Sequence, residues 1–286
     1  GQFVGVFEVP GHEVGALVGR EPAWRGEPVA VVDHDAPHGV VRWTNERARR
    51  AGHEVTGLDR AGGGFATHVG DINDLDLLHR FCRGLDRVYH TAALVQESGA
   101  WADFFRVNVL GADSVALVAR EHGVREIVHL SSVMVHGFDF PEGVTEEGPL
   151  DPADNPYCAT KILSEEALLR HHDPGRFDVY LIRPGDVYGP GSVPWTLRPL
   201  AMMKRGRWIH ADGDHAILNH VYVDNLLDGI DLVVARRASG TPFIITDGVR
   251  TTTRAFFGHY ERMLGLRPAP NIPRATCWIM GGAPQW

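Results

Sequence analysis

The chain has 286 residues and a formal net charge of −8, because 36 acidic residues outnumber 28 basic ones. This length allows one or two domains with a sizeable core, and 44% apolar with 22% charged residues excludes wholesale disorder and collagen-like repeats. The excess of acidic residues argues against a nucleic-acid partner. The lack of any run of about 18 apolar residues argues against a membrane span. Three widely spaced cysteines favour a reducing, cytoplasmic compartment.

Short β-branched runs alternate with helical patterns from Pro28 onward. This alternation is typical of βαβ units and predicts an α/β fold, with a mostly parallel sheet covered by helices. Strands are expected at residues 29–32, 54–58, 68–69, 87–90, 126–130 and 179–182. Helices are expected at residues 40–51, 74–83, 104–122 and 157–171, and Gly52 closes the first of them.

The alternation becomes less regular after Pro184. Further strands are predicted at residues 220–223 and 243–246, and further helices at residues 225–235 and 252–264. We expect residues 28–190 to carry the main sheet and residues 191–286 to form mainly a smaller substrate-binding lobe, truncated at its C-terminal end. Residues 1–27 have no predicted element.

The strongest chemical signal is the pair Tyr157 and Lys161. Their i, i+4 spacing places the phenol and the ammonium on one face of a helix, about 6 Å apart. A nearby cation lowers the pKa of a phenol from about 10 and makes it a usable general acid or base. The alternative is a solvated lysine beside an aromatic residue, but the chain has only two lysines and six tyrosines, so this spacing is rare by chance.

Ser132 is the second candidate, since it follows the predicted strand at residues 126–130 and precedes the helix of Tyr157. Parallel α/β sheets present the carboxyl ends of their strands to the ligand. A hydroxyl at that edge can hold a substrate oxygen near the phenol. The alternative is an ordinary serine at the end of a strand.

Together with several further segments, these residues resemble the extended short-chain dehydrogenase/reductase family, which includes nucleotide-sugar epimerases and 3β-hydroxysteroid dehydrogenases. The resemblance spans about residues 29–264, and the interval between Ser132 and Tyr157 also fits it. The further segments are Val88-Tyr89-His90-Thr91-Ala92-Ala93, Asn108-Val109-Leu110-Gly111, His129 to Gly137, Arg183 to Gly191, and His220-Val221-Tyr222-Val223-Asp224-Asn225.

The resemblance implies a Rossmann-type doubly wound sheet over residues 28–190 and catalysis by Ser132, Tyr157 and Lys161. It implies an NAD(P)-dependent oxidoreductase that moves a hydride between the nicotinamide and a carbinol or carbonyl carbon of a sterol-like or sugar-like small molecule. The alternatives are an NAD-dependent nucleotide-sugar epimerase and, from another class, a cofactor-poor pseudoenzyme or binding protein. A homodimer paired through the helices at residues 104–122 and 157–171 is also implied.

The choice of cofactor depends on Asp59, which closes the second predicted strand and follows Gly39 in the chain. An acid at that place accepts hydrogen bonds from a ribose diol and repels a 2′-phosphate, which favours NAD. Arg60 follows directly and could pair with that phosphate, so NADP is the alternative. The resemblance assigns Asp71 and Ile72 to the adenine, although Asp71 could also cap the next helix. It assigns further cofactor contacts to Ala92, Ala93, Asn108, Lys161, Pro184 and Val187.

The loop between the first strand and the first helix departs from the family pattern. Glycines there let backbone amides reach the pyrophosphate, but the segment Asp33 to Arg42 offers only Gly39 and contains Asp35 as a second acid. A reading-frame slip over about residues 33–47 would explain this break, and a truly altered or lost cofactor site is the rival. As written, the loop predicts weak NAD binding.

Three other classes of enzyme lack their motifs in this chain. The histidines and cysteines show no metal-ligand spacing, so no metal site is predicted. No G-x-S-x-G elbow surrounds Ser132, which argues against a hydrolase. The dehydratases of the resembling family place an acidic pair just after the catalytic hydroxyl residue, whereas this chain has Val133 and Met134 there.

Overall fold

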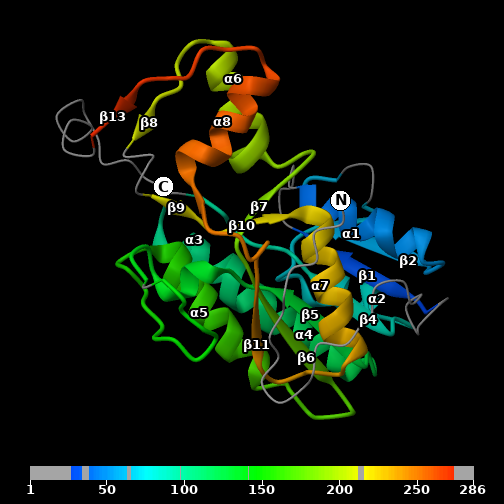
Figure 1. Ribbon diagram of the computed structural model, residues 1–286. Coiled ribbons are helices and arrows are strands. Elements are labelled where there is room, and N and C mark those ends of the chain that lie inside the picture. The colour runs from blue at the N-terminus through cyan, green and yellow to red at the C-terminus, as the bar shows by residue number, and fades with distance from the viewer. Residues whose placement is uncertain are drawn as a thin grey trace.

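The computed structural model describes residues 27–33, 39–62, 66–96, 98–140, 142–211 and 216–273. Its centre is a seven-stranded sheet in the order β11-β6-β5-β4-β1-β2-β3, and all neighbouring strands are parallel (Figure 1). The predicted α/β fold of the Rossmann type is therefore confirmed. The strands are β1 (Val29–Val32), β2 (Val55–Asp59), β3 (His68–Val69), β4 (Arg87–His90), β5 (Glu126–Leu130), β6 (Asp178–Pro184) and β11 (Pro242–Ile245).

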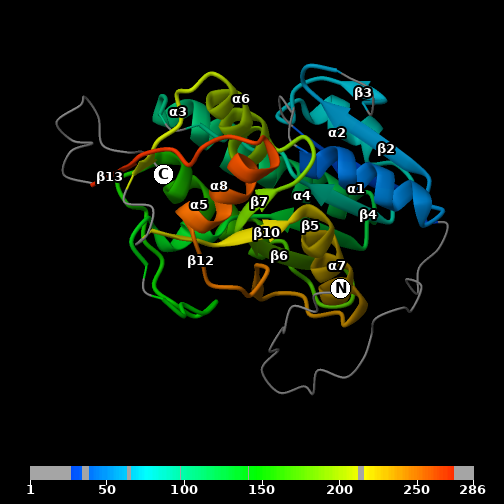
Figure 2. The same ribbon diagram turned by 45° about the horizontal axis from the view of Figure 1, so that its top comes forward.

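Helices cover both faces of this sheet (Figures 1 and 2). The helices α1 (Gly39–Arg50) and α7 (Val223–Ala235) contribute apolar side chains to the cluster on one face. The other face is covered by α2 (Leu75–Phe81), α4 (Gly111–Glu121) and α5 (Pro156–Leu169).

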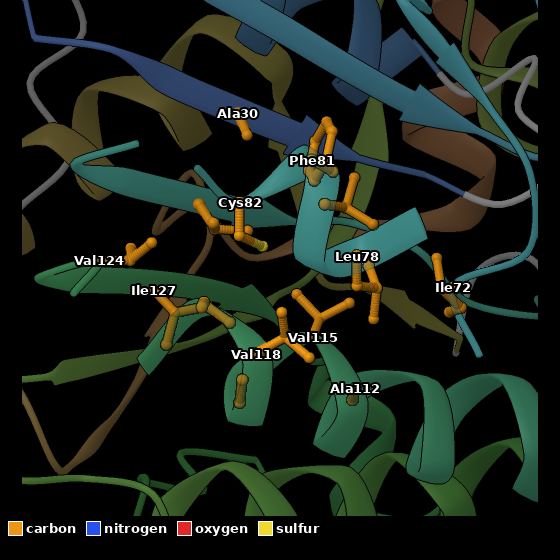
Figure 3. Close-up of a cluster of buried hydrophobic side chains, with 14 of the residues drawn as sticks. Ala30, Ile72, Leu78, Phe81, Cys82, Ala112, Val115, Val118, Val124 and Ile127 are labelled. Carbon is orange, nitrogen blue, oxygen red and sulfur yellow. The ribbon is translucent and has the colours of Figure 1, made fainter. Parts of the chain in front are cut away.

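Figure 3 shows the second of these faces, where helix side chains pack onto strand side chains. Leu78 from α2 and Val115 from α4 are fully buried and belong to the same cluster as Ile127 of β5. Burial of such residues stabilises the fold by about 2 kcal/mol for each side chain relative to exposure. This packing fixes α4 and α5 beside the sheet, and α5 carries two of the predicted catalytic residues.

A third apolar cluster lies apart from the sheet, at the top of Figure 1. It joins the π-helical segment η3 (Val193–Leu197), α6 (Arg198–Lys204) and α8 (Thr253–Met263) through Met203, Trp208 and Phe257. Three two-stranded pairs connect this region, namely β7 (Asp186–Tyr188) with β10 (His220–Tyr222), β9 (Ile217–Leu218) with β12 (Thr251–Thr252), and β8 (His210–Ala211) with β13 (Asn271–Ile272).

The division of the chain at residue 190 stays a prediction. The helix α7 and the strand β11 both follow that position, yet they pack on and extend the main sheet. The small lobe around α6 and α8 is accordingly formed by only part of the residues after 190.

The predicted helix at residues 104–122 begins earlier and is not regular. It starts with α3 (Trp101–Phe104), continues as the π-helical segment η1 (Phe105–Leu110) and ends as α4. The extra residue of a π-turn is not encoded by apolar spacing, so periodicity could not reveal it. Its consequence is that Asn108 is buried between α5 and the segment after β4.

The alternative role of Asp71 as a helix cap is wrong. Asp74 caps α2, because its carboxylate accepts a hydrogen bond from the Leu77 amide. Asp71 instead accepts from the Asn73 amide at 2.9 Å and from the Arg106 guanidinium at 2.6 Å.

Most of the anomalous loop after β1 lies outside the described residues, since these stop at Asp33 and resume at Gly39. The frame slip and the altered site therefore both stay predictions. Within the described part of the chain, no helix is both long and apolar enough to cross a membrane.

Gly185, between β6 and β7, allows a test of the close contact with the backbone of Asn219. A Cβ atom on Gly185 would stand 1.9 Å from the Asn219 carbonyl oxygen, which is backbone and cannot move aside. We expect Gly185→Ala to reduce the free energy of unfolding by about 3 kcal/mol, measured by urea denaturation. A Cβ atom on Gly258 in α8 meets only the flexible end of Arg262 at 3.4 Å, so Gly258→Ala should change stability by less than about 1 kcal/mol. Equal losses in the two variants would contradict this assignment.

Candidate active site

Ser132 and Tyr157 meet at the carboxyl edge of the sheet. Ser132 lies two residues after the end of β5 and caps the short 3₁₀ segment η2 (Val133–His136), since its Oγ accepts from the Met134 amide at 3.1 Å. The Ser132 hydroxyl lies close enough to the Tyr157 phenol to lower the pKa of that phenol. The structure therefore brings together two hydroxyl groups that lie on separate elements of the sequence.

The first turn of α5 orients Tyr157. Asn155 is the N-cap of the helix, and its Oδ1 accepts hydrogen bonds from the amides of Tyr157 at 2.9 Å and Cys158 at 3.3 Å. Pro156 occupies the first helical position, where its missing N–H costs no hydrogen bond. The helix start is thus fixed by local sequence, and Tyr157 is fixed with it.

Lys161 lies one turn further along α5 and is buried, with 2% of its surface exposed. Its ammonium donates a hydrogen bond of 2.7 Å to the Leu130 carbonyl at the end of β5. Burial lowers the pKa of this ammonium to about 8, against the opposing effect of the Glu165 carboxylate. Lys161 is therefore a buried cation that also ties α5 to β5.

The expected lowering of the phenol pKa by Lys161 is not found. Burial raises the pKa of Tyr157 to about 12, the hydrogen bond with Ser132 opposes this rise, and Cys158 and Asp186 add to it. The ammonium of Lys161 is held by the Leu130 carbonyl. In this structure Tyr157 is consequently a proton donor at neutral pH.

A buried ion pair holds α5 to β6. The Arg183 guanidinium donates to both oxygens of Glu165, at 2.9 and 2.7 Å, and both side chains are almost fully buried. Arg183 also donates to the Glu146 carbonyl at 2.9 Å. Sequence reasoning missed this pair, although Arg183 lies in a segment that carries the family resemblance.

Two buried histidines lie beside Lys161. His90 and His129 approach each other with their Nδ1 atoms 3.0 Å apart, and His129 Nε2 lies 3.0 Å from the Ser164 hydroxyl. Burial lowers both pKa values, that of His90 to about 3, and the Lys161 charge adds to the effect. Both rings are therefore neutral, and neither adds a second positive charge beside the Lys161 ammonium.

The predicted cofactor residues lie at the ends of the parallel strands. Gly39 is the first residue of α1, whose first turn contains no acid, and Asp59 is the last residue of β2 with its Oδ1 accepting from the Ala61 amide at 2.8 Å. Arg60 is exposed. Ala92 and Ala93 are buried after β4, Pro184 ends β6, and Val187 lies in β7.

Three of the predicted cofactor side chains contact other parts of the protein. Asp71 pairs with Arg106, and although partial burial would raise its pKa, the hydrogen bonds from Asn73 and Arg106 lower it to about 2. Asn108 accepts from the Leu94 amide at 2.7 Å and donates to Thr160 at 3.0 Å. Ile72 is buried in the core beside α4. Their predicted contacts with the adenine and the cofactor stay predictions.

The low pKa of Lys161 can be measured directly, because Lys161 and Lys204 are the only lysines in the chain. Carbon-13 labelling of the lysine ε-carbons should give two NMR signals. The variant Lys204→Gln, at an exposed position in α6, leaves the signal of Lys161. We expect this signal to titrate near pH 8, since burial disfavours the ammonium. Titration at the ordinary lysine value of about 10.4 would contradict the burial of this side chain as described.

Comparison with known proteins identifies the family. The model of the "NAD dependent epimerase/dehydratase family" matches residues 42–245. The chain is 29% identical to a 4-hydroxy-2-methyl-3-oxo-4-farnesyl-3,4-dihydroquinoline-1-oxide ketoreductase of Stigmatella aurantiaca, over 79% of this chain and 67% of the relative. It is 31% identical to a dTDP-glucose 4,6-dehydratase of Streptomyces antibioticus, over 66% of this chain and 58% of that relative.

The chain thus spans about two thirds or less of the length of these two curated relatives. One similar solved structure is the dTDP-glucose 4,6-dehydratase DesIV of Streptomyces venezuelae, which was crystallised with NAD and TYD. It superposes with a TM-score of 0.73 at 24% sequence identity, and the match covers 85% of this chain and 84% of that chain. This likeness confirms the fold, and the family match confirms the resemblance read from the sequence motifs. The chain belongs to the NAD dependent epimerase/dehydratase family, an enzyme family of the extended short-chain dehydrogenase/reductase type whose cofactor is NAD.

Proposed function

We propose that this protein interconverts a carbonyl and a carbinol carbon of a small molecule, with the substrate oxygen held between Ser132 and Tyr157. The observation that supports this most directly is the approach of these two hydroxyl groups beyond the carboxyl end of β5, at the starts of η2 and α5. A substrate oxygen in contact with both can accept one hydrogen bond from each, and Tyr157 can pass its proton along that bond. When bound, the cofactor would supply the hydride for reduction as NADH and would accept the hydride in oxidation as NAD.

Apart from the loop after β1, most of which lies outside the described residues, the residues at the sheet edge suit this cofactor. The N-terminus of α1 at Gly39 is free of acids in its first turn, as suits a pyrophosphate. Asp59 at the end of β2 would accept hydrogen bonds from the adenosine ribose, and the absence of a 2′-phosphate would suit its charge. Lys161 would hold the nicotinamide ribose, and Pro184 and Val187 would border the nicotinamide.

The same geometry does not favour the elimination of water. Dehydration needs an acid and a base beside the substrate carbon, but Val133 and Met134 follow Ser132 and bear no carboxyl group. Val133 is also buried in the protein. Oxidoreduction is therefore the better proposal, even though one of the two curated relatives is a dehydratase.

The role of Tyr157 can be tested by removing its hydroxyl. We expect Tyr157→Phe to fold normally and to lose about 10²- to 10⁴-fold of turnover with NADH and a panel of ketones, because the ring still packs and the transferable proton is gone. The control is Tyr180→Phe. The Tyr180 hydroxyl is buried on β6 and has no hydrogen-bond partner among the described residues, so its loss should leave turnover unchanged. Normal turnover in Tyr157→Phe would defeat the catalytic assignment.

We also propose a cytoplasmic homodimer that pairs through α4 and α5. These helices lie side by side, and only part of their apolar surface is available for pairing. Val115, Val118 and Leu168 face the protein's own core and are buried. The apolar residues left exposed on the η1–α4 and α5 helices are Leu110, Leu117 and Leu169.

Sedimentation at micromolar concentration tests the dimer. The wild-type chain should sediment with the mass of two chains, and Leu117→Glu should shift it toward one, because a buried charge opposes pairing. Met263→Glu is the matched control, since Met263 is an exposed apolar residue on α8 in the other lobe. A wild-type mass of one chain would refute the proposal.

A further inference from the structure

The segment at residues 142–155 connects the surroundings of the two proposed catalytic hydroxyl groups. It lies between η2, which Ser132 caps, and Asn155, the N-cap of the helix that carries Tyr157. It contains neither helix nor strand, so its course is set by contacts with the rest of the protein. Those contacts therefore act on the position of Tyr157 relative to Ser132.

The end of the 142–155 segment carries backbone strain. Ala153 and Asp154 both lie in the left-handed region, with φ of 51° and 48°. Neither is a glycine, and this conformation costs of the order of 1 kcal/mol per residue, so it persists only where surrounding contacts hold the chain in place. Because these residues come directly before Asn155, the segment needs anchors to keep the start of α5 fixed.

Two hydrogen bonds tie the 142–155 segment to η2. The Asp151 amide donates to the Val135 carbonyl at 2.9 Å. His136 is buried, and its Nδ1 lies 2.9 Å from the Pro149 carbonyl oxygen, which can only accept. The segment therefore returns to the short turn that follows Ser132.

Glu146 supplies the other anchors, and its backbone supplies the first of them. Arg183 of β6 donates to the Glu146 carbonyl at 2.9 Å. The same guanidinium pairs with Glu165 of α5. One buried side chain therefore holds both the 142–155 segment and the helix of Tyr157.

The side chain of Glu146 supplies the second anchor, at the open edge of the sheet. The strand β11 is last in the sheet order and pairs with β6 alone among the described strands. The Ile245 carbonyl accepts from Gly185 on the β6 side at 3.0 Å, so the N–H of the preceding Ile244 points away from β6. That N–H donates to Glu146 Oε1 at 2.8 Å. A donor that an edge strand would otherwise leave unpaired is thus used to hold the segment.

We propose that Glu146 is a positioning residue that clamps the 142–155 segment to β6 and β11 and thereby holds Tyr157 in place relative to Ser132. This inference rests on the proposed function. Proton transfer to a substrate oxygen needs exact placement of the phenol, and a misplacement of about 1 Å can cost about 10²-fold in rate. The side chain of Glu146 acts here as a hydrogen-bond acceptor, and its partner, the Ile244 amide, is neutral. Glutamine can therefore replace it, whereas alanine cannot.

The first test needs no substrate. Hydrogen exchange of the full chain is followed by mass spectrometry on peptides that cover residues 148–155 and 242–246, which do not include the substituted position. We expect both peptides to exchange about tenfold faster in Glu146→Ala than in the wild type, because the bonded amides open more often. Glu146→Gln should exchange like the wild type, and so should Glu147→Ala, at the exposed neighbouring position.

Two results of this test would overturn the inference. Unchanged exchange at residues 242–246 in Glu146→Ala would show that the side chain does not hold β11. Faster exchange there with unchanged exchange at residues 148–155 would show that Glu146 covers the edge of the sheet without holding the segment before Tyr157.

The second test measures turnover with NADH and the panel of ketones. In Glu146→Ala we expect kcat to fall about tenfold and the KM for NADH to change by less than about twofold, because Tyr157 is misplaced while the cofactor residues at the other strand ends are unaffected. Glu146→Gln should recover the wild-type kcat, and Glu147→Ala should keep it.

The outcomes separate the two proposals. Wild-type kcat in Glu146→Ala, or a loss of kcat that Glu146→Gln does not recover, would overturn the positioning role. A lack of turnover in the wild type would count against the proposed function, and hydrogen exchange would still decide whether Glu146 clamps the segment.

Discussion

The ion pair between Arg183 and Glu165 fixes the geometry on which the site depends. Arg183 belongs to β6 and Glu165 to α5, so this pair sets the distance between the sheet and the helix that carries Tyr157 and Lys161. A buried pair of this kind contributes little net stability, because desolvation costs about as much as the attraction returns. Its value lies in specificity, since removal of either partner would leave a buried charge uncompensated.

Glu165 has a second effect through its place in α5. It lies one turn after Lys161, and its charge partly offsets the cost of burying that ammonium. The neutral rings of His90 and His129 avoid a second positive charge at the same place. The Lys161 ammonium is therefore stabilised by the Glu165 carboxylate, which is itself paired with Arg183. The charges that matter for Lys161 thus come from β6 and α5, while the histidines on β4 and β5 stay neutral.

The sequence was sufficient for six of the seven strands of the sheet and for placing Ser132 and Tyr157 at one edge, because apolar alternation and parallel strands determine which residues reach the carboxyl edge. It assigned the seventh strand, β11, to the smaller lobe. The sequence could not predict the hydrogen-bond partner of Lys161 or the pKa of Tyr157. The spacing of Tyr157 and Lys161 predicts a shared helix face, but whether the ammonium turns to the phenol or to the Leu130 carbonyl depends on how closely α5 approaches β5.

The π-helical segment η1 places a constraint on how this chain can vary. Each residue turns an α-helix by about 100°, and η1 absorbs one residue more than a regular helix would between α3 and α4. Deletion of a single residue there would yield a smoother helix, yet it would rotate Trp101–Phe104 around the axis relative to α4 and break the link from Asn108 to Thr160. Insertions and deletions should therefore be tolerated far better in surface loops than within η1. This holds even for a deletion that would make η1 a regular α-helix.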